Sequence, residues 1–186
     1  MDNNVLHEQR LQTLAQFKSK REKALKNLCL VGLIVFALSL LISIFVPIVS
    51  IYGEAIKWGD VFDIPDKQLQ RSVFGQDIKT GKTLYIVNII VSLAGLAVCG
   101  YCKFKNAAGN LMIQMNMLAG IAGVISCLMM TYAQAILSIV FSDDGKASGI
   151  WIWLLVVAAA GYYAWLSISA KIYGKGIEAI EHSLNK

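Results

Sequence analysis

The sequence predicts an all-α integral membrane protein with four transmembrane helices, N- and C-termini cytoplasmic, and a short N-terminal amphipathic helix. Three observations lead to this fold class. Hydrophobic residues make up 56% of the 186 residues and charged residues only 16%, whereas soluble proteins carry about 25% charged residues. The charged residues avoid four long windows, and the basic ones are concentrated in alternate connections between those windows.

Each of the four windows without Asp, Glu, Lys or Arg is long enough to cross a bilayer, which takes about 20 apolar residues as an α-helix. These windows are residues 27–53, 83–102, 106–142 and 147–170. The chain therefore divides into a cytoplasmic amphipathic helix at 1–26, a four-span bundle at 27–173 with an outer loop at 53–82, and a cytoplasmic tail at 174–186.

The distribution of basic residues predicts the orientation. The N-terminal segment, the second connection and the C-terminal residues from Lys171 onward hold eleven of the 17 Lys and Arg residues. Cytoplasmic segments carry the excess of basic residues, so both termini are expected in the cytoplasm. The net charge of +5 thus reflects topology, and no run of basic and aromatic residues points to a nucleic-acid partner. We expect a multi-pass protein of the bacterial inner (plasma) membrane, with the lipid bilayer as its solvent.

The N-terminal segment should be an amphipathic helix, because Leu11, Leu14, Ala15 and Leu25 fall near one side of it. One interpretation is a solvated lead-in helix that only sets the topology. The other is a docking surface for a cytoplasmic partner.

The first span is expected over about residues 28–52, and Pro47 near its outer end should either kink the helix or mark where it leaves the membrane. Residues 48–52 and 56–58 are expected to pair as a short hairpin on the outer face. Aromatic residues near the outer ends of the spans are expected as interfacial anchors, namely Trp58, Phe62, Trp151 and Trp153. The outer loop also contains Asp60, Asp63 and Asp66, which we interpret as a solvated acidic turn because the spacing of a calcium loop is absent.

Small and polar residues follow one face of the third span, at alternating steps of four and three. With Cys127 between them, the main positions are Asn116, Gly120, Gly123, Thr131, Gln134 and Ser138. A shorter stripe on the second span contains Asn88, Ser92 and Gly95. In lipid, small residues allow helices to approach closely and polar ones hydrogen-bond across helices, so these stripes are expected to pack helices together. The alternative is that they form the neutral lining of an oligomeric pore.

Cys99-Gly-Tyr-Cys102 is the one motif with possible redox chemistry. The chain's size and four spans resemble the bacterial quinone-coupled disulfide-forming oxidoreductases. That family carries its cysteine pairs in outward-facing loops, whereas the outer segments here contain no cysteine. Packing or lipidation is therefore the expected role of both thiols.

The sequence predicts no enzyme, cofactor or metal site. His7 and His182 lie at opposite ends of the chain, and no His, Asp or Glu occurs inside a span to serve as a catalytic base. Missing intramembrane charge also argues against ion-coupled transport.

The leading functional hypothesis is a non-enzymatic protein that acts through helix–helix association, with itself as a homo-oligomer or with a membrane-protein partner. Two alternatives stay open. One is a small oligomeric membrane pore or channel, and the other is an immunity protein against a pore-forming toxin.

Overall fold

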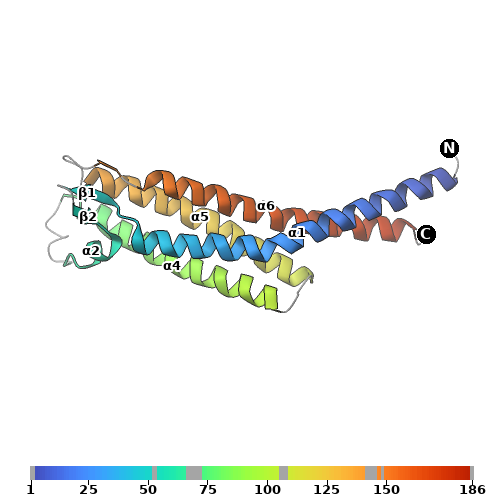
Figure 1. Cartoon of the computed structure of the whole chain (residues 1–186), viewed down its shortest axis with the longest axis horizontal. Coiled ribbons are helices and arrows are strands. Elements are labelled where there is room, and N and C mark those ends of the chain that lie inside the picture. The colour runs from blue at the N-terminus through green and yellow to red at the C-terminus, as the bar shows by residue number, and fades with distance from the viewer. Residues whose placement is uncertain are drawn as a thin grey trace.

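The chain is a bundle of four long helices that run along a common axis (Figure 1). The structure is a computed structural model that describes residues 3–51, 54–65, 73–104, 109–140, 146–147 and 149–184. Its long helices are α1 (Asn3–Phe45), α4 (Gly75–Phe104), α5 (Asn110–Val140) and α6 (Ile150–Leu184). All four are long and apolar enough to cross a membrane. This confirms the predicted helical architecture, with four long apolar helices that could span a membrane.

The helices pack as a ring in which each touches two principal neighbours. Helix α1 packs against α4 and α6, and α5 packs against the same two helices. Both termini lie at one end of the bundle, which we call the termini end (Figure 1). The buried core runs along the axis in three clusters, centred on Trp58 and Trp153, on Phe36 and Tyr163, and on Ile113.

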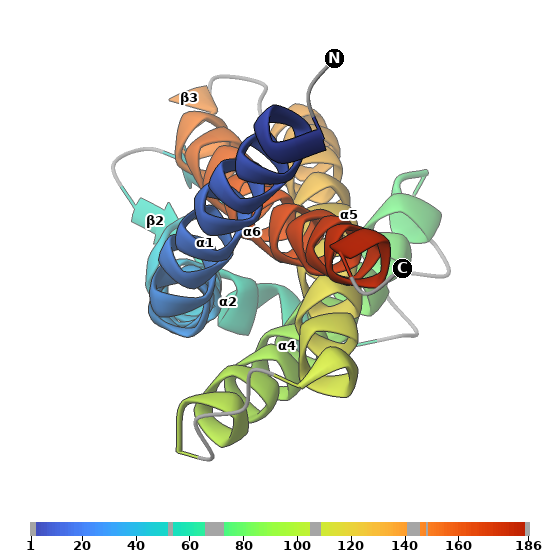
Figure 2. The same cartoon turned by 90° about the vertical axis from the view of Figure 1, so that its right-hand side faces the viewer.

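The predicted boundary near residue 26 is not a break in the helix. Helix α1 continues without interruption from Asn3 to Phe45, just before Pro47, and α6 likewise includes the predicted C-terminal tail as far as Leu184. In Figure 2, viewed from the termini end, α1 and α6 come forward past the ends of α4 and α5. We call this projecting pair, residues 3–24 of α1 and 171–184 of α6, the stem.

Contacts between side chains hold the stem together and explain why both helices continue beyond the bundle. The Phe17 and Tyr173 rings lie with their centroids 5.8 Å apart. An ion pair joins Lys18 Nζ to Glu181 Oε1 at 2.9 Å. The absence of a side chain at Gly176 lets the Phe17 ring lie directly against α6.

The opposite end, which we call the sheet end, carries a small antiparallel sheet. The expected hairpin is present as β1 (Val49–Ile51) and β2 (Glu54–Ile56), with Val49 opposite Ile56. A third strand, β3 (Lys146–Ala147), pairs with the other edge of β1, giving the order β2-β1-β3. The sequence analysis did not predict this strand because two residues are too few to show an alternating pattern.

Two tryptophans are not the interfacial anchors that the sequence predicted. Trp58 begins the short helix α2 (Trp58–Phe62) but is only 1% exposed, and its ring stacks on Tyr85 with centroids 5.2 Å apart. Trp153 is also 1% exposed, whereas Trp151 is 79% exposed, as an outer aromatic residue should be. The reason is that α2, β1 and the first turns of α4 cover the sheet end, so that aromatic residues there become core.

The predicted outer loop, residues 53–82, is helical from Gly75 onward, where α4 begins. Within it, the Asp60 carboxylate accepts a hydrogen bond from the backbone N–H of Lys57 at 2.7 Å and so caps the start of α2. Asp66 lies outside the described residues.

Candidate functional site

The predicted stripe residues lie inside the bundle. Apart from Thr131, which is half-buried, all of them are buried: Asn88, Ser92, Gly95, Asn116, Gly120, Gly123, Gln134 and Ser138. The structure gathers the polar ones into three layers along the axis, which we call the serine layer, the thiol layer and the outer layer.

The serine layer joins α1, α4 and α5 around one amide. The Asn88 side chain donates to Ser43 Oγ at 2.9 Å and accepts from Ser126 Oγ at 2.7 Å. Ser39 Oγ donates to the same amide oxygen at 3.3 Å, and Ser92 Oγ donates to Ser39 Oγ at 3.1 Å. Each of these five side chains is at most 2% exposed. Because a buried amide without partners is costly in lipid, this layer holds the three helices in one register.

The thiol layer joins α4, α5 and α6 around Asn116. Tyr163 donates its hydroxyl proton to Asn116 Oδ1 at 2.7 Å, and Asn116 Nδ2 donates to Cys102 Sγ at 3.0 Å. Cys99 Sγ lies 3.2 Å from the Tyr163 hydroxyl. Both thiols are free and buried, and both are engaged with neighbouring side chains. The layer therefore uses its cysteines as packing and hydrogen-bonding groups.

The outer layer fixes the start of the sheet end. Gln134 Nε2 donates to the carbonyl oxygens of Pro47 at 3.2 Å and Ile48 at 2.8 Å, where the chain leaves α1. Gly149, which precedes α6, has φ +95°, and a Cβ there would lie 3.2 Å from Gln134 Nε2. A position with positive φ and little room for a Cβ favours glycine.

Thr131 and Ser138 have a different role from the other stripe residues. Thr131 donates its hydroxyl to Cys127 O at 2.9 Å, and Ser138 donates to Ala135 O at 2.9 Å, both within α5. These bonds satisfy polar groups inside their own helix and join no second helix.

The stripe glycines are points of closest approach between helices. A Cβ at Gly95 or Gly123 would meet the Phe36 ring, and one at Gly120 would lie 2.9 Å from Ala164 Cα. Gly161 and Gly100 also lie in long helices, yet a Cβ at either position would meet nothing within 4 Å. The stripe glycines therefore lie at helix contacts, as Gly81 of α4 also does, whereas Gly100 and Gly161 do not.

Some members of the layers lie outside the stripes predicted on the second and third spans. Ser39 and Ser43 lie four residues apart in the first span, with the same kind of small-residue spacing as those stripes. Ser126 does not fall on the four-and-three spacing of the stripe along α5, and Tyr163 is one of several aromatic residues in α6. The sequence pattern therefore singles out neither residue as a hydrogen-bonding partner.

A cavity of about 710 Å³ opens at the termini end. It lies where the stem leaves the bundle, next to the ends of α4 and α5. Asn116 and Cys102 line its inner part, so the cavity reaches the thiol layer from outside. Arg21, Lys26 and Lys103 line its outer part. The sequence analysis did not predict it, because its walls come from helices far apart in the chain.

Within the part of the chain that the structure describes, no group of three or more His, Cys, Asp or Glu side chains could hold a metal ion. No protein-family profile, curated protein or solved structure matches the chain. The functional argument therefore rests on the geometry alone.

Proposed function

We propose that this chain is a non-enzymatic membrane protein that acts through helix–helix association, with itself or with a membrane-protein partner. The observation that carries the proposal is that its polar stripes are hydrogen-bonded inside one copy of the chain. The serine layer joins three helices and the thiol layer joins three. The surfaces left for other molecules are the apolar outer faces of the spans and the stem.

The stem supports the same proposal because it adds a surface outside the bundle. It projects past the ends of α4 and α5 (Figure 1), and its two helices are already joined by the Lys18–Glu181 ion pair. Leu6 is 37% exposed and Leu11 is 45% exposed on its α1 side. A further helix that packed along the stem would meet apolar and charged side chains on a preformed pair of helices.

The proposal includes cytoplasmic termini and a bacterial inner membrane. The basic residues near the termini end support this orientation through the positive-inside rule. A cysteine introduced in place of Glu54, which is exposed at the sheet end, should react with a membrane-impermeant maleimide in intact cells. A cysteine at Lys20 in the stem should react only after permeabilisation. The reverse pattern would contradict the orientation.

The pore alternative makes a different prediction. A pore lined by the stripes would require Asn88 and Gln134 to face water, whereas both are at most 1% exposed and hydrogen-bonded within the chain. Purified protein in liposomes should therefore give no conductance above that of protein-free liposomes. Unitary currents whose ion selectivity changes with Asn88→Asp would refute the association proposal in favour of the pore.

Association itself is measured by counting photobleaching steps of the labelled protein in liposomes at low protein-to-lipid ratio. Two or more steps per particle would identify a second copy as the partner. Single steps would assign the association to another membrane protein. The immunity alternative is the case in which that partner is a toxin, and its test is protection of cells that express this chain. Single steps together with channel currents would count against the proposal.

A further inference from the structure

The cavity at the termini end has the size of a ligand pocket. Its volume of about 710 Å³ lies within the range of about 300–1,000 Å³ that is typical of sites for small molecules. All four long helices contribute to its wall. Figure 2 looks onto this end of the molecule, where α1 and α6 stand in front of the ends of α4 and α5.

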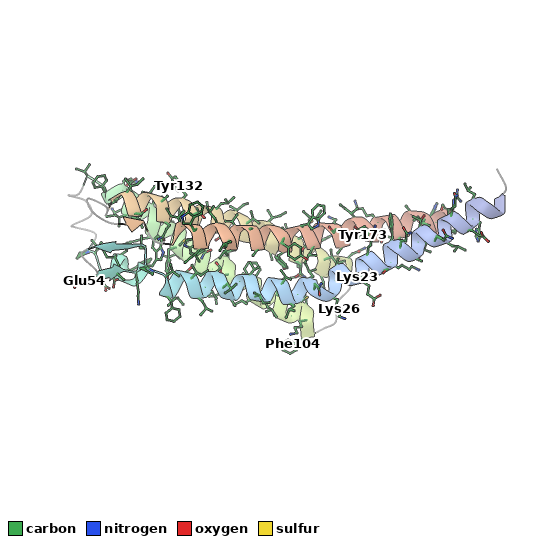
Figure 3. All side chains as sticks on the ribbon, turned by 45° about the horizontal axis from the view of Figure 1, so that its top comes forward. Lys23, Lys26, Glu54, Phe104, Tyr132 and Tyr173 are labelled. Atoms are coloured by element: carbon green, nitrogen blue, oxygen red, sulfur yellow. The ribbon has the colours of Figure 1, made fainter. Side chains whose placement is uncertain are left out.

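The outer part of the cavity is basic. The lining side chains include four cations, Lys18, Arg21, Lys26 and Lys103, and two carboxylates, Glu22 and Glu181. Lys18 is paired with Glu181 at 2.9 Å, so Arg21, Lys26 and Lys103 outweigh Glu22 and the remaining lining is net positive. Arg21 lies toward Gly174 of α6, whereas Lys26 comes from α1 and Lys103 from α4. Figure 3 shows Lys23 and Lys26 on the part of α1 beside the end of α4 that carries Phe104.

The inner part of the cavity is largely apolar, apart from Asn116 and Cys102 of the thiol layer. Leu25, Leu28, Ile113 and Ile177 line it, and Leu28 and Ile113 are each only 2% exposed because they belong to the core. A basic mouth above an apolar floor suits an amphiphile with an anionic head.

The cavity also lies at the level where the spans end. Lys26 immediately precedes the charge-free window 27–53, and Lys103 immediately follows the window 83–102. At the same level, Phe104 is 92% exposed and Leu111 is 66% exposed. Large apolar side chains with that exposure are expected in contact with lipid, so this level marks the boundary between hydrocarbon and headgroups.

We propose that this cavity binds the headgroup of an anionic phospholipid from the leaflet at the termini end. The phosphate would be held by Lys26 and Lys103, and the part of the lipid next to the headgroup would lie against Leu25 and Ile113. Basic pockets between spanning helices are suited to anionic headgroups because charge attraction acts beside a surface that already excludes water. This lipid site is separate from the proposed association with a protein partner. Lipid binding can be measured on the purified chain alone.

The test is native mass spectrometry of the purified protein in a neutral detergent. Phosphatidylglycerol and phosphatidylcholine with identical acyl chains are titrated separately, so that only the headgroup differs. We expect phosphatidylglycerol to bind about tenfold tighter or more, since each well-placed Lys or Arg at a membrane surface favours an anionic lipid by about a factor of five. Equal affinity for the two lipids would overturn the proposal.

A matched pair of double variants separates the cavity from the general basic charge of this end. Lys26→Gln with Lys103→Gln removes two cations from the mouth and should weaken phosphatidylglycerol binding about 30-fold. Lys23→Gln with Lys175→Gln removes two exposed cations of α1 and α6 that do not line the cavity. Because these two charges lie outside the cavity, salt should screen their effect on a lipid bound inside it, and this control should lose about threefold or less. Equal losses in both double variants would overturn a defined site.

Two further arms complete the test. Lys26→Arg with Lys103→Arg keeps both charges and should retain binding within about threefold, which also shows that the mouth tolerates substitution. Inorganic phosphate is titrated over the same concentrations as the lipid and should neither bind nor displace phosphatidylglycerol. Displacement by phosphate at matched concentration would assign the cavity to a soluble anion and overturn the lipid assignment.

Discussion

Replacement of Gly120 by alanine should destabilise the bundle far more than the same replacement at Gly161. Both glycines lie inside long helices, α5 and α6, so the change in helix propensity is the same. A Cβ at Gly120 would lie 2.9 Å from Ala164 Cα and 3.2 Å from Ala164 Cβ. A Cβ at Gly161 would meet nothing within 4 Å.

The size of the effect follows from the distance that α5 and α6 must separate. Carbon atoms pack best at about 3.5–4.0 Å, so the Gly120 Cβ is too close to the α6 backbone by about 0.6–1.1 Å. One turn away, the Tyr163 hydroxyl donates to Asn116 at 2.7 Å, and such a shift would stretch this bond beyond its usual range of about 2.5–3.0 Å. Overpacking costs about 1–3 kcal/mol and an interhelical hydrogen bond about 0.6–1.7 kcal/mol. Because alanine itself favours a helix over glycine by up to about 1 kcal/mol, we expect Gly120→Ala to lower the free energy of unfolding by about 1–4 kcal/mol.

Gly161→Ala should range from no change to a gain of about 1 kcal/mol, because alanine favours a helix over glycine. The free energy of unfolding is measured by titrating sodium dodecyl sulfate into mixed micelles and following tryptophan fluorescence. The parent and the two variants are compared at one protein concentration. If Gly120→Ala matched the parent, or if the two variants lost equal stability, α5 and α6 would not be in the contact described here.

Two other predictions follow from the polar layers. Asn88→Ala should lower the free energy of unfolding by about 1–3 kcal/mol, since it removes bonds to Ser43 and Ser126; a loss no greater than that of Thr131→Ala, whose hydroxyl bonds only within α5, would contradict the serine layer. Among the four free cysteines, Cys29 should react first with a small permeant maleimide, since it is the one that is only partly buried, and it lines the cavity; faster reaction of Cys99 or Cys102 in the folded protein would contradict the packing of the thiol layer.

The sequence was sufficient to predict the spanning helices. Charge-free windows exist because each charged group is costly in hydrocarbon, and this constraint acts on every residue of a span independently of its neighbours. The end of α1 before Pro47 and the β1–β2 hairpin followed from similarly local signals.

The partners of the stripe residues were beyond such local signals. Gly95 and Gly123 belong to different helices, yet a Cβ at either would meet the same Phe36 ring of α1. That meeting depends on how three helices are rotated and shifted relative to one another. Spacing within one helix contains no information about these rotations. The sequence therefore predicted the stripes, but not which residues of other helices they contact.

The prediction that both Trp151 and Trp153 are interfacial anchors was wrong for a simpler reason. Trp151 and Trp153 are two residues apart, and 3.6 residues per turn place their side chains about 200° apart around α6. Only one of them can face outward, and the structure buries Trp153 to 1% exposure. An aromatic belt predicted from composition alone ignores this geometry.

The way in which the stripes are used limits how the protein can associate. Small residues that allow close approach are often the contact between membrane proteins. Here Gly120 approaches the Ala164 backbone and Gly123 approaches Phe36 within the same chain. A second copy or another protein could use this face only if α5 left α6, which would break the Tyr163–Asn116 hydrogen bond. Any association that leaves the bundle intact must therefore use the outer faces or the stem, and a variant such as Gly120→Ala should affect the stability of one copy before it affects the number of copies.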